Sequence, residues 1–108
     1  MALNILIVDD ESDIRKLISG ILDDEGYETR AVGSCIEAID AMQKRSPNLV
    51  ILDVWLGDGE IDGLRLLDLI NENHEYVPVV MISGHGTIET TVSAIKKGAY
   101  DFIEKPFD

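Results

Sequence analysis

Five polar residues that directly follow or close short apolar runs are the candidates for chemistry. Asp9 and Asp10 follow one run, Asp53 and Ser83 close two others, and Lys105 follows a fourth. Carboxylates about 4 Å apart repel each other by roughly 4 kcal/mol at an effective dielectric of 20, so a fold that gathers them needs a cation. Oxygen ligands without a nearby His or Cys favour Mg²⁺ or Mn²⁺, and both ions also bind phosphate oxygens.

This set of groups suits one reaction above others, the attack of a carboxylate on a phosphoryl group. A divalent cation and a lysine ammonium would share the negative charge that develops. We expect Asp53 to be the nucleophile and the hydroxyl of Ser83 to donate to a phosphoryl oxygen. Taken singly, each residue has an ordinary explanation: Asp10 as a helix cap, Asp53 as a strand end and Ser83 as part of a turn. Their coincidence at several strand ends favours the functional interpretation.

The elements that must position these residues alternate along the chain. Apolar runs rich in Ile and Val predict strands buried on both faces, at residues 4–8, 28–32, 49–52, 79–82 and 101–104. Amphipathic segments lie between them and predict helices. This alternation predicts an α/β fold with a doubly wound parallel sheet, whose ligands lie beyond the carboxyl ends of the strands.

Apolar residues at helical spacing predict four helices between these strands. The inward residues expected in the first helix are Ile14, Leu17, Ile18, Ile21 and Leu22. Those expected in the second and third helices are Ile36, Ile39, Met42, Leu64, Leu67 and Ile70. Ser34 and Glu37 form a predicted capping box. The other predicted signals are the caps Asp62 and Thr87 and the stops Gly26 and Gly98.

Length and composition limit the classes of function. The chain has 108 residues, enough for one domain, and its 45% hydrophobic content predicts a folded core. A net charge of −12 argues against direct binding to nucleic acid or to anionic lipid. The single cysteine, Cys35, permits no internal disulfide, and no apolar run approaches the ~18 residues of a membrane span. We expect a cytoplasmic protein without a membrane partner.

The sequence resembles the receiver domain of two-component response regulators over essentially its whole length. The resemblance rests on four motifs in order, VDDE at 8–11, ILDVW at 51–55, MISG at 81–84 and FIEKPF at 102–107. Residues 83–107 are also similar to receivers that precede ATPase and DNA-binding domains in nitrogen-regulation activators. This resemblance implies a flavodoxin-like sheet of five strands in the order 2-1-3-4-5. The family's fifth helix is missing, so we expect residues 1–108 to be a fragment of a longer regulator.

The resemblance also assigns roles to the candidate residues. It implies that Asp53 is the phosphoacceptor and that Asp10, Asp53 and the backbone carbonyl of Trp55 hold Mg²⁺ or Mn²⁺. Asp9 would support the metal through water, and Lys105 would contact the phosphate. Ser83 matches the switch hydroxyl. Phe102 matches the aromatic residue that changes rotamer with it.

As a function, the resemblance implies a phosphorylation-dependent switch and not an enzyme beyond its own phosphoryl transfer and slow dephosphorylation. A sensor histidine kinase would be the donor, an attached output domain the target, and transcription the controlled process. Whether the domain forms a homodimer is left open by the sequence. One alternative is a Mg²⁺-dependent aspartyl-phosphate phosphatase, but Trp55 stands where that class places an acidic residue. Another is a pseudo-receiver that only binds partners, against which the complete set of Asp10, Asp53, Ser83 and Lys105 argues.

Three features near the site depart from the family or have an alternative interpretation. The segment WLGDGEIDG, residues 55–63, reaches the glycine that matches the family about two residues late. Trp55 and His85 are expected to flank the approach of water to a phosphorylated Asp53, and the indole of Trp55 to exclude that water. The alternative is that Trp55 points away and packs under residues 56–62. Glu11 matches an acidic position of the family but could equally face solvent near the start of the first helix.

Overall fold

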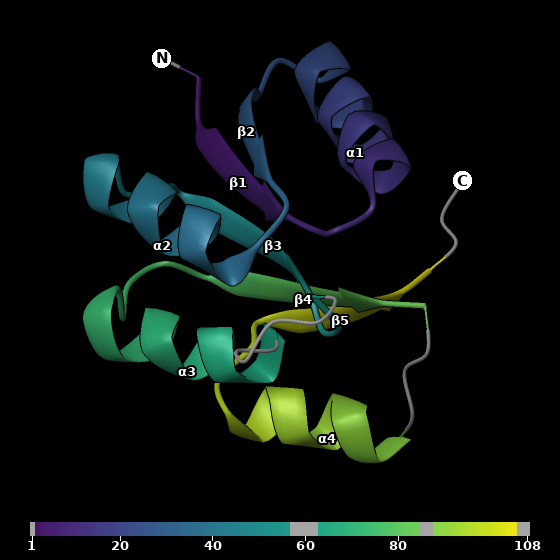
Figure 1. Cartoon of the computed structure of the whole chain (residues 1–108), viewed down its shortest axis with the longest axis vertical. Coiled ribbons are helices and arrows are strands. Elements are labelled where there is room, and N and C mark those ends of the chain that lie inside the picture. Colours follow the sequence, from purple (N-terminus) through teal and green to yellow (C-terminus); the bar gives the residue numbers. More distant parts are fainter. Residues whose placement is uncertain (1, 57–62, 85–87, 106–108) are drawn as a thin grey trace.

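A central parallel sheet organises the chain. The computed structural model describes residues 2–56, 63–84 and 88–105. Within these ranges the elements, in order, are β1 (Asn4–Val8), α1 (Ser12–Asp24), β2 (Glu28–Val32), α2 (Cys35–Lys44), β3 (Leu49–Asp53), α3 (Gly63–Asn73), β4 (Val79–Ser83), α4 (Ile88–Lys96) and β5 (Asp101–Glu104). The strands pair in parallel in the order β2-β1-β3-β4-β5 (Figure 1). The predicted fold class and strand order are confirmed.

Burial divides the strands into a central group and two edges. All five residues of β1 are buried, and β3 and β4 are buried or nearly so along their length. The prediction of burial on both faces is therefore correct for these three strands. It is wrong for β2 and β5, whose residues are all exposed or half-buried. Each of them pairs on one side only, and their sequences, ETRAV and DFIE, carry the charged residues that an edge strand tolerates.

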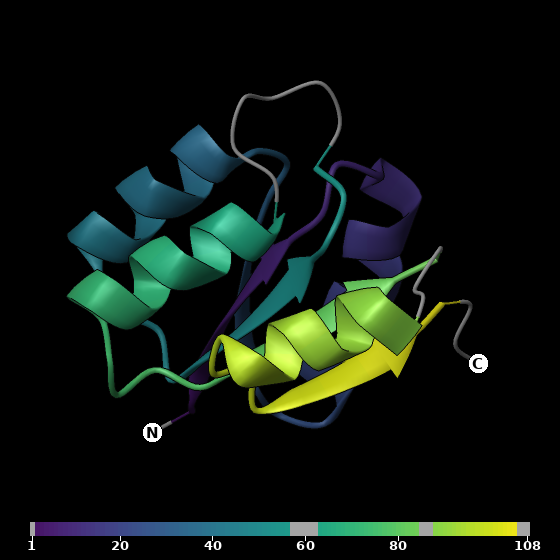
Figure 2. The ribbon, with the colours of Figure 1, turned by 90° about the horizontal axis from the view of Figure 1, so that it is seen from below.

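Helices cover the two faces of the sheet unequally. α1 packs on one face, where the core is small and contains Ile5, Ile7, Ile18 and Ile82. α2, α3 and α4 lie on the other face (Figure 2), over the larger core that includes Leu6, Val50, Leu52, Leu66 and Met81. The right-handed connections of parallel strands require this distribution, because the strand order reverses once.

The apolar residues of the helices have the predicted spacing, but not all of them are buried. In α1, Ile18 is buried and Ile14 and Leu22 pack against the smaller core, whereas Leu17 and Ile21 are exposed. One helix alone covers this face among the described residues, so the outer part of its apolar stripe has no neighbour. In α2, Ile36 is 78% exposed, because it lies in the first turn and points away from the sheet.

Helix ends follow the predicted signals where the structure describes them. The hydroxyl of Ser34 accepts a hydrogen bond from the Glu37 N–H at 3.2 Å, as the capping box requires. Gly26 and Gly98 have φ values of 92° and 101°, a conformation that favours glycine after a helix. Asp62 and Thr87, the other predicted caps, lie outside the described residues.

The end of the sheet also agrees with the expectation. β5 closes at Glu104, and no helix follows it among the described residues. No helix among the described residues is long and apolar enough to cross a membrane.

The larger core should dominate the stability of the fold. Leu66 is fully buried in it, so Leu66→Ala should lower the free energy of unfolding by about 2 to 5 kcal/mol through lost burial and a residual cavity. Ile36→Ala removes an exposed residue and should change the stability by less than about 0.5 kcal/mol. Urea denaturation of both variants measures the difference. Equal losses would contradict the assignment of the core.

Candidate phosphoacceptor site

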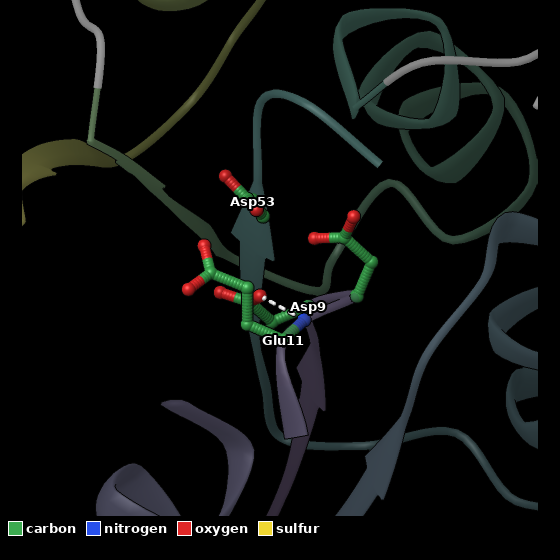
Figure 3. A group of neighbouring side chains, drawn as sticks. Asp9, Glu11 and Asp53 are labelled. Atoms are coloured by element: carbon green, nitrogen blue, oxygen red, sulfur yellow. Dashed lines mark hydrogen bonds between the residues drawn. The ribbon is translucent and has the colours of Figure 1, made fainter. Parts of the chain in front are cut away.

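Four strands bring the candidate residues to one edge of the sheet. Asp9 follows β1, Asp53 closes β3, Ser83 closes β4 and Lys105 follows β5, and the carboxyl ends of parallel strands share an edge. The pairing continues past β5, because the Lys105 N–H donates to the Ser83 carbonyl at 2.8 Å. The carboxylates of Asp9, Glu11 and Asp53 meet above this edge (Figure 3). The predicted convergence is confirmed.

The ammonium of Lys105 is the centre of this group. Its Nζ atom lies 2.8 Å from Oδ2 of Asp9, 3.2 Å from Oε1 of Glu11 and 3.4 Å from Oδ2 of Asp53. Burial alone would lower the pKa of Lys105, but the carboxylates of Asp9, Asp53 and Glu11 outweigh it and raise this pKa above its usual value. The lysine is therefore charged at every physiological pH.

Asp9 is the most constrained carboxylate of the site. It is fully buried, and its Oδ1 atom accepts a hydrogen bond from the Glu11 N–H at 2.8 Å. Its backbone is held on both sides: the N–H donates to the Val32 carbonyl, and the carbonyl accepts a hydrogen bond from Nη1 of Arg15 at 2.8 Å. These contacts leave Asp9 no freedom to turn away from Lys105.

Asp53 lies almost wholly out of solvent at the end of β3. Burial and the neighbouring charge of Asp9 raise its pKa from 3.8 to about 6, and Lys105 and the Trp55 N–H oppose this shift only in part. Two buried carboxylates next to each other share a single buried ammonium. The site therefore holds more negative charge than the described residues neutralise.

The residues present fit a divalent metal ion. One carboxylate oxygen from each of Asp9, Asp10, Glu11 and Asp53 lies within 4.8 Å of the other three. The Oδ2 atom of Asp9 is buried and accepts no hydrogen bond of ordinary geometry from the described residues, although Lys105 pairs with it. A cation that accepts oxygen ligands would relieve both the excess charge and the unsatisfied atom.

A glycine beside Asp53 brings the start of α3 against the end of β3. The Gly63 N–H donates to the Val54 carbonyl at 2.8 Å. A Cβ at this position would overlap the carbonyl oxygen of Asp53 and would approach Cα and O of Val54 to 2.8 Å. Any larger residue would push α3 away from the strand. Gly63 therefore fixes the distance between α3 and the backbone that carries Asp53.

The structure also locates the remaining predicted residues. Ser83 is fully buried at the end of β4, and Phe102 of β5 packs against the larger core. Asp10 is exposed at the rim of the acidic group. Trp55 is 54% exposed, and its expected role as a cover over a phosphorylated Asp53 stays a prediction. His85 and the segment 57–62 lie outside the described residues.

One contact was not expected from the sequence. The sequence allows Glu11 either to belong to the site or to face solvent, and the structure pairs it with Lys105, 94 residues further along the chain. The adjacent Asp9 and Asp10 were the only sequence signal that a further carboxylate belonged to this group.

The fold and the acidic edge together define the class of the protein. The family model described as the response regulator receiver domain matches residues 5–108, so the chain belongs to this family. It is thus a signalling domain of two-component systems.

The individual relatives of the chain include regulators of nitrogen assimilation. The chain is 59% identical over 108 residues to the nitrogen assimilation regulatory protein NtrX of Azorhizobium caulinodans, covering 100% of this chain and 24% of the relative. It is 34% identical over 102 residues to the DNA-binding transcriptional regulator NtrC of Klebsiella pneumoniae, covering 94% and 21%. The crystal structure of the receiver domain of NtrX from Brucella abortus matches with a TM-score of 0.92 at 60% identity, covering 96% of this chain and 87% of that chain.

The chain spans about a quarter of the length of these curated relatives. The predicted similarity to receivers of nitrogen-regulation activators is confirmed.

The raised pKa of Asp53 leads to a prediction about stability. Between pH 3.8 and about 6 the native state binds more protons than the unfolded chain, so the free energy of unfolding decreases as the pH rises through this range. Asp53→Asn removes the carboxylate. In EDTA the variant should therefore be more stable than the parent at pH 7, by at most about 3 kcal/mol, and the gain should shrink towards pH 4. Urea denaturation at several pH values measures it; a gain that does not depend on pH would contradict the shift.

The fit to a metal ion leads to a second prediction. Mg²⁺ should stabilise the fold, because it relieves carboxylate repulsion that exists only in the native state. At ten times its dissociation constant one bound ion contributes about 1.4 kcal/mol, which raises the melting temperature by several degrees. Asp10→Asn should lose most of this increase, whereas Asp40→Asn, on the exposed surface of α2, should retain it. A melting curve of the parent that does not respond to Mg²⁺ would exclude the site.

Proposed function

We propose that this chain is a phosphorylation-dependent switch in which Asp53 accepts a phosphoryl group from a sensor histidine kinase. The observation that carries the proposal is the pairing of a buried carboxylate at a strand end with the Lys105 ammonium, 3.4 Å away, inside a group of four carboxylates. A buried lysine in contact with the acceptor is suited to hold phosphoryl oxygens. A structural ion pair would need only one carboxylate.

The transfer is a displacement at phosphorus. A carboxylate oxygen of Asp53 forms the new bond to phosphorus while the bond from phosphorus to the kinase's histidine nitrogen breaks, and the imidazole leaves with the electron pair. Lys105 stays beside the equatorial oxygens. A bound Mg²⁺ would supply further positive charge to these oxygens, and Asp10, Asp53 and the carbonyl of Trp55 are the residues that would hold it, with Asp9 acting through water.

The same strand ends support a route by which phosphorylation of Asp53 would change the rest of the domain. Ser83 lies at the end of β4, next to the strand that carries Asp53, and Asp53 pairs with Ile82 in the register. A hydroxyl that donates to a phosphoryl oxygen would draw this strand end towards Asp53. Phe102 pairs with Met81 on the opposite side of β4 and packs against the larger core, so a change at Ser83 reaches it directly. We propose these two residues as the switch pair.

The output of the switch is inferred from the relatives. NtrC of Klebsiella pneumoniae is a DNA-binding transcriptional regulator, and this chain matches only 21% of it. We propose that an attached output domain, of the ATPase and DNA-binding type, controls transcription. The net charge of −12 assigns contact with DNA to that domain and not to the receiver.

One experiment separates this switch from a phosphatase or a pseudo-receiver. The chain is incubated with acetyl phosphate and Mg²⁺, and any acid-stable, base-labile phosphate is located by mass spectrometry. We expect one phosphate on Asp53 that persists long enough to be isolated, and none in Asp53→Asn. Rapid hydrolysis of many equivalents of acetyl phosphate would favour the phosphatase. An unlabelled parent that melts normally would favour the pseudo-receiver.

A further inference from the structure

Glu11 is placed to cap a helix, but its side chain serves another contact. It is the N-cap residue of α1, with an extended backbone, and it makes no side-chain capping hydrogen bond. Its Oε1 atom instead lies 3.2 Å from Nζ of Lys105. The side chain of Glu11 is 60% exposed and that of Lys105 is 8% exposed. A solvent-facing carboxylate therefore pairs with an otherwise buried ammonium.

The three partners of Lys105 differ in their freedom to leave. Asp9 is buried and fixed by hydrogen bonds to its side chain and its backbone. Asp53 is the group that would react. Glu11 is the exposed partner, and solvent can receive its carboxylate without a desolvation cost. When a phosphoryl oxygen binds Lys105, Glu11 is therefore the carboxylate that leaves the ammonium.

We infer that Glu11 is a positioning residue, which holds Lys105 in the unphosphorylated state and thereby slows the phosphorylation of Asp53. This inference rests on the proposed function of Asp53. A lysine ammonium has three donor hydrogens, and in this structure three carboxylates surround it. A phosphoryl oxygen that approaches Lys105 must displace one of them. The ion pair with Glu11 is broken before the transition state, and its free energy adds to the barrier.

Two substitutions of Glu11 separate the contact from the charge. Glu11→Gln removes the charge and weakens the contact with Lys105. Glu11→Asp keeps the charge, but its carboxylate is one methylene shorter, and aspartate at an N-cap accepts hydrogen bonds from the first backbone N–H groups of the helix. Both changes release Lys105. Asp13→Asn is the matched control, because it removes one exposed negative charge from the first turn of the same helix.

The test compares the rates at which acetyl phosphate phosphorylates the parent and these three variants. Mg²⁺ is titrated to saturation for each protein, so that a changed metal affinity does not enter the rate. We expect Glu11→Gln and Glu11→Asp to be phosphorylated about two- to fivefold faster than the parent, the factor that corresponds to an exposed ion pair. Asp13→Asn should match the parent. Glu11→Asp should also melt at a higher temperature, because α1 gains a cap.

The outcomes keep the two proposals apart. If the parent takes phosphate on Asp53 but Glu11→Gln is no faster than Asp13→Asn, the restraint by Glu11 is wrong and the phosphoacceptor stands. If Glu11→Asp is phosphorylated at the parent's rate while Glu11→Gln is phosphorylated faster, the charge of Glu11 slows the reaction and its contact with Lys105 does not. The restraint by contact is then wrong. If the parent takes no phosphate, the proposed function of Asp53 fails and the role of Glu11 fails with it.

Discussion

The repulsion among four neighbouring carboxylates, three of which share one ammonium, is the constraint on which the site depends. Asp9, Asp10, Glu11 and Asp53 are brought together by strand ends, and Lys105 is the cation that the described residues supply. Burial and, after it, the charge of Asp9 raise the pKa of Asp53 to about 6, so this carboxylate is less stable in its ionised form than in water. A bound cation, or a new partner that replaces one of the carboxylates around Lys105, would therefore change the free energy of the site.

The site combines a rigid floor with an adaptable rim. Asp9, Asp53 and Ser83 belong to the buried ends of central strands, and Gly63 fixes the neighbouring helix against one of them. Asp10 and Glu11 lie where β1 passes into α1, and both are exposed. The fixed side chains keep the carboxylate of Asp53 in place, and the exposed side chains exchange partners at a small free-energy cost. Fixed and adaptable side chains thus lie next to each other at one edge of the sheet.

Periodicity and strand alternation were enough to predict much of this arrangement. The bounds of β1, β2 and β5 match the predicted ranges, and β3 and β4 each extend one residue further, through Asp53 and Ser83. The exposure of β2, β5, Leu17 and Ile21 was not predictable in this way, because a hydrophobic pattern does not say whether a second helix covers the same face.

The contacts of single side chains were also beyond the sequence. In the sequence, Glu11 looks the same as a solvent-exposed residue at the start of a helix. Only the folded sheet brings Lys105 next to it. The chain order of these groups affects how the site assembles. Synthesis proceeds from the amino terminus, so the carboxylates at positions 9 and 53 leave the ribosome well before residue 105 is made. A nascent chain without β5 has the acidic residues but not the ammonium that holds them together. Under the function proposed for Asp53, the ability to accept phosphate would therefore be acquired last, when the fifth strand pairs.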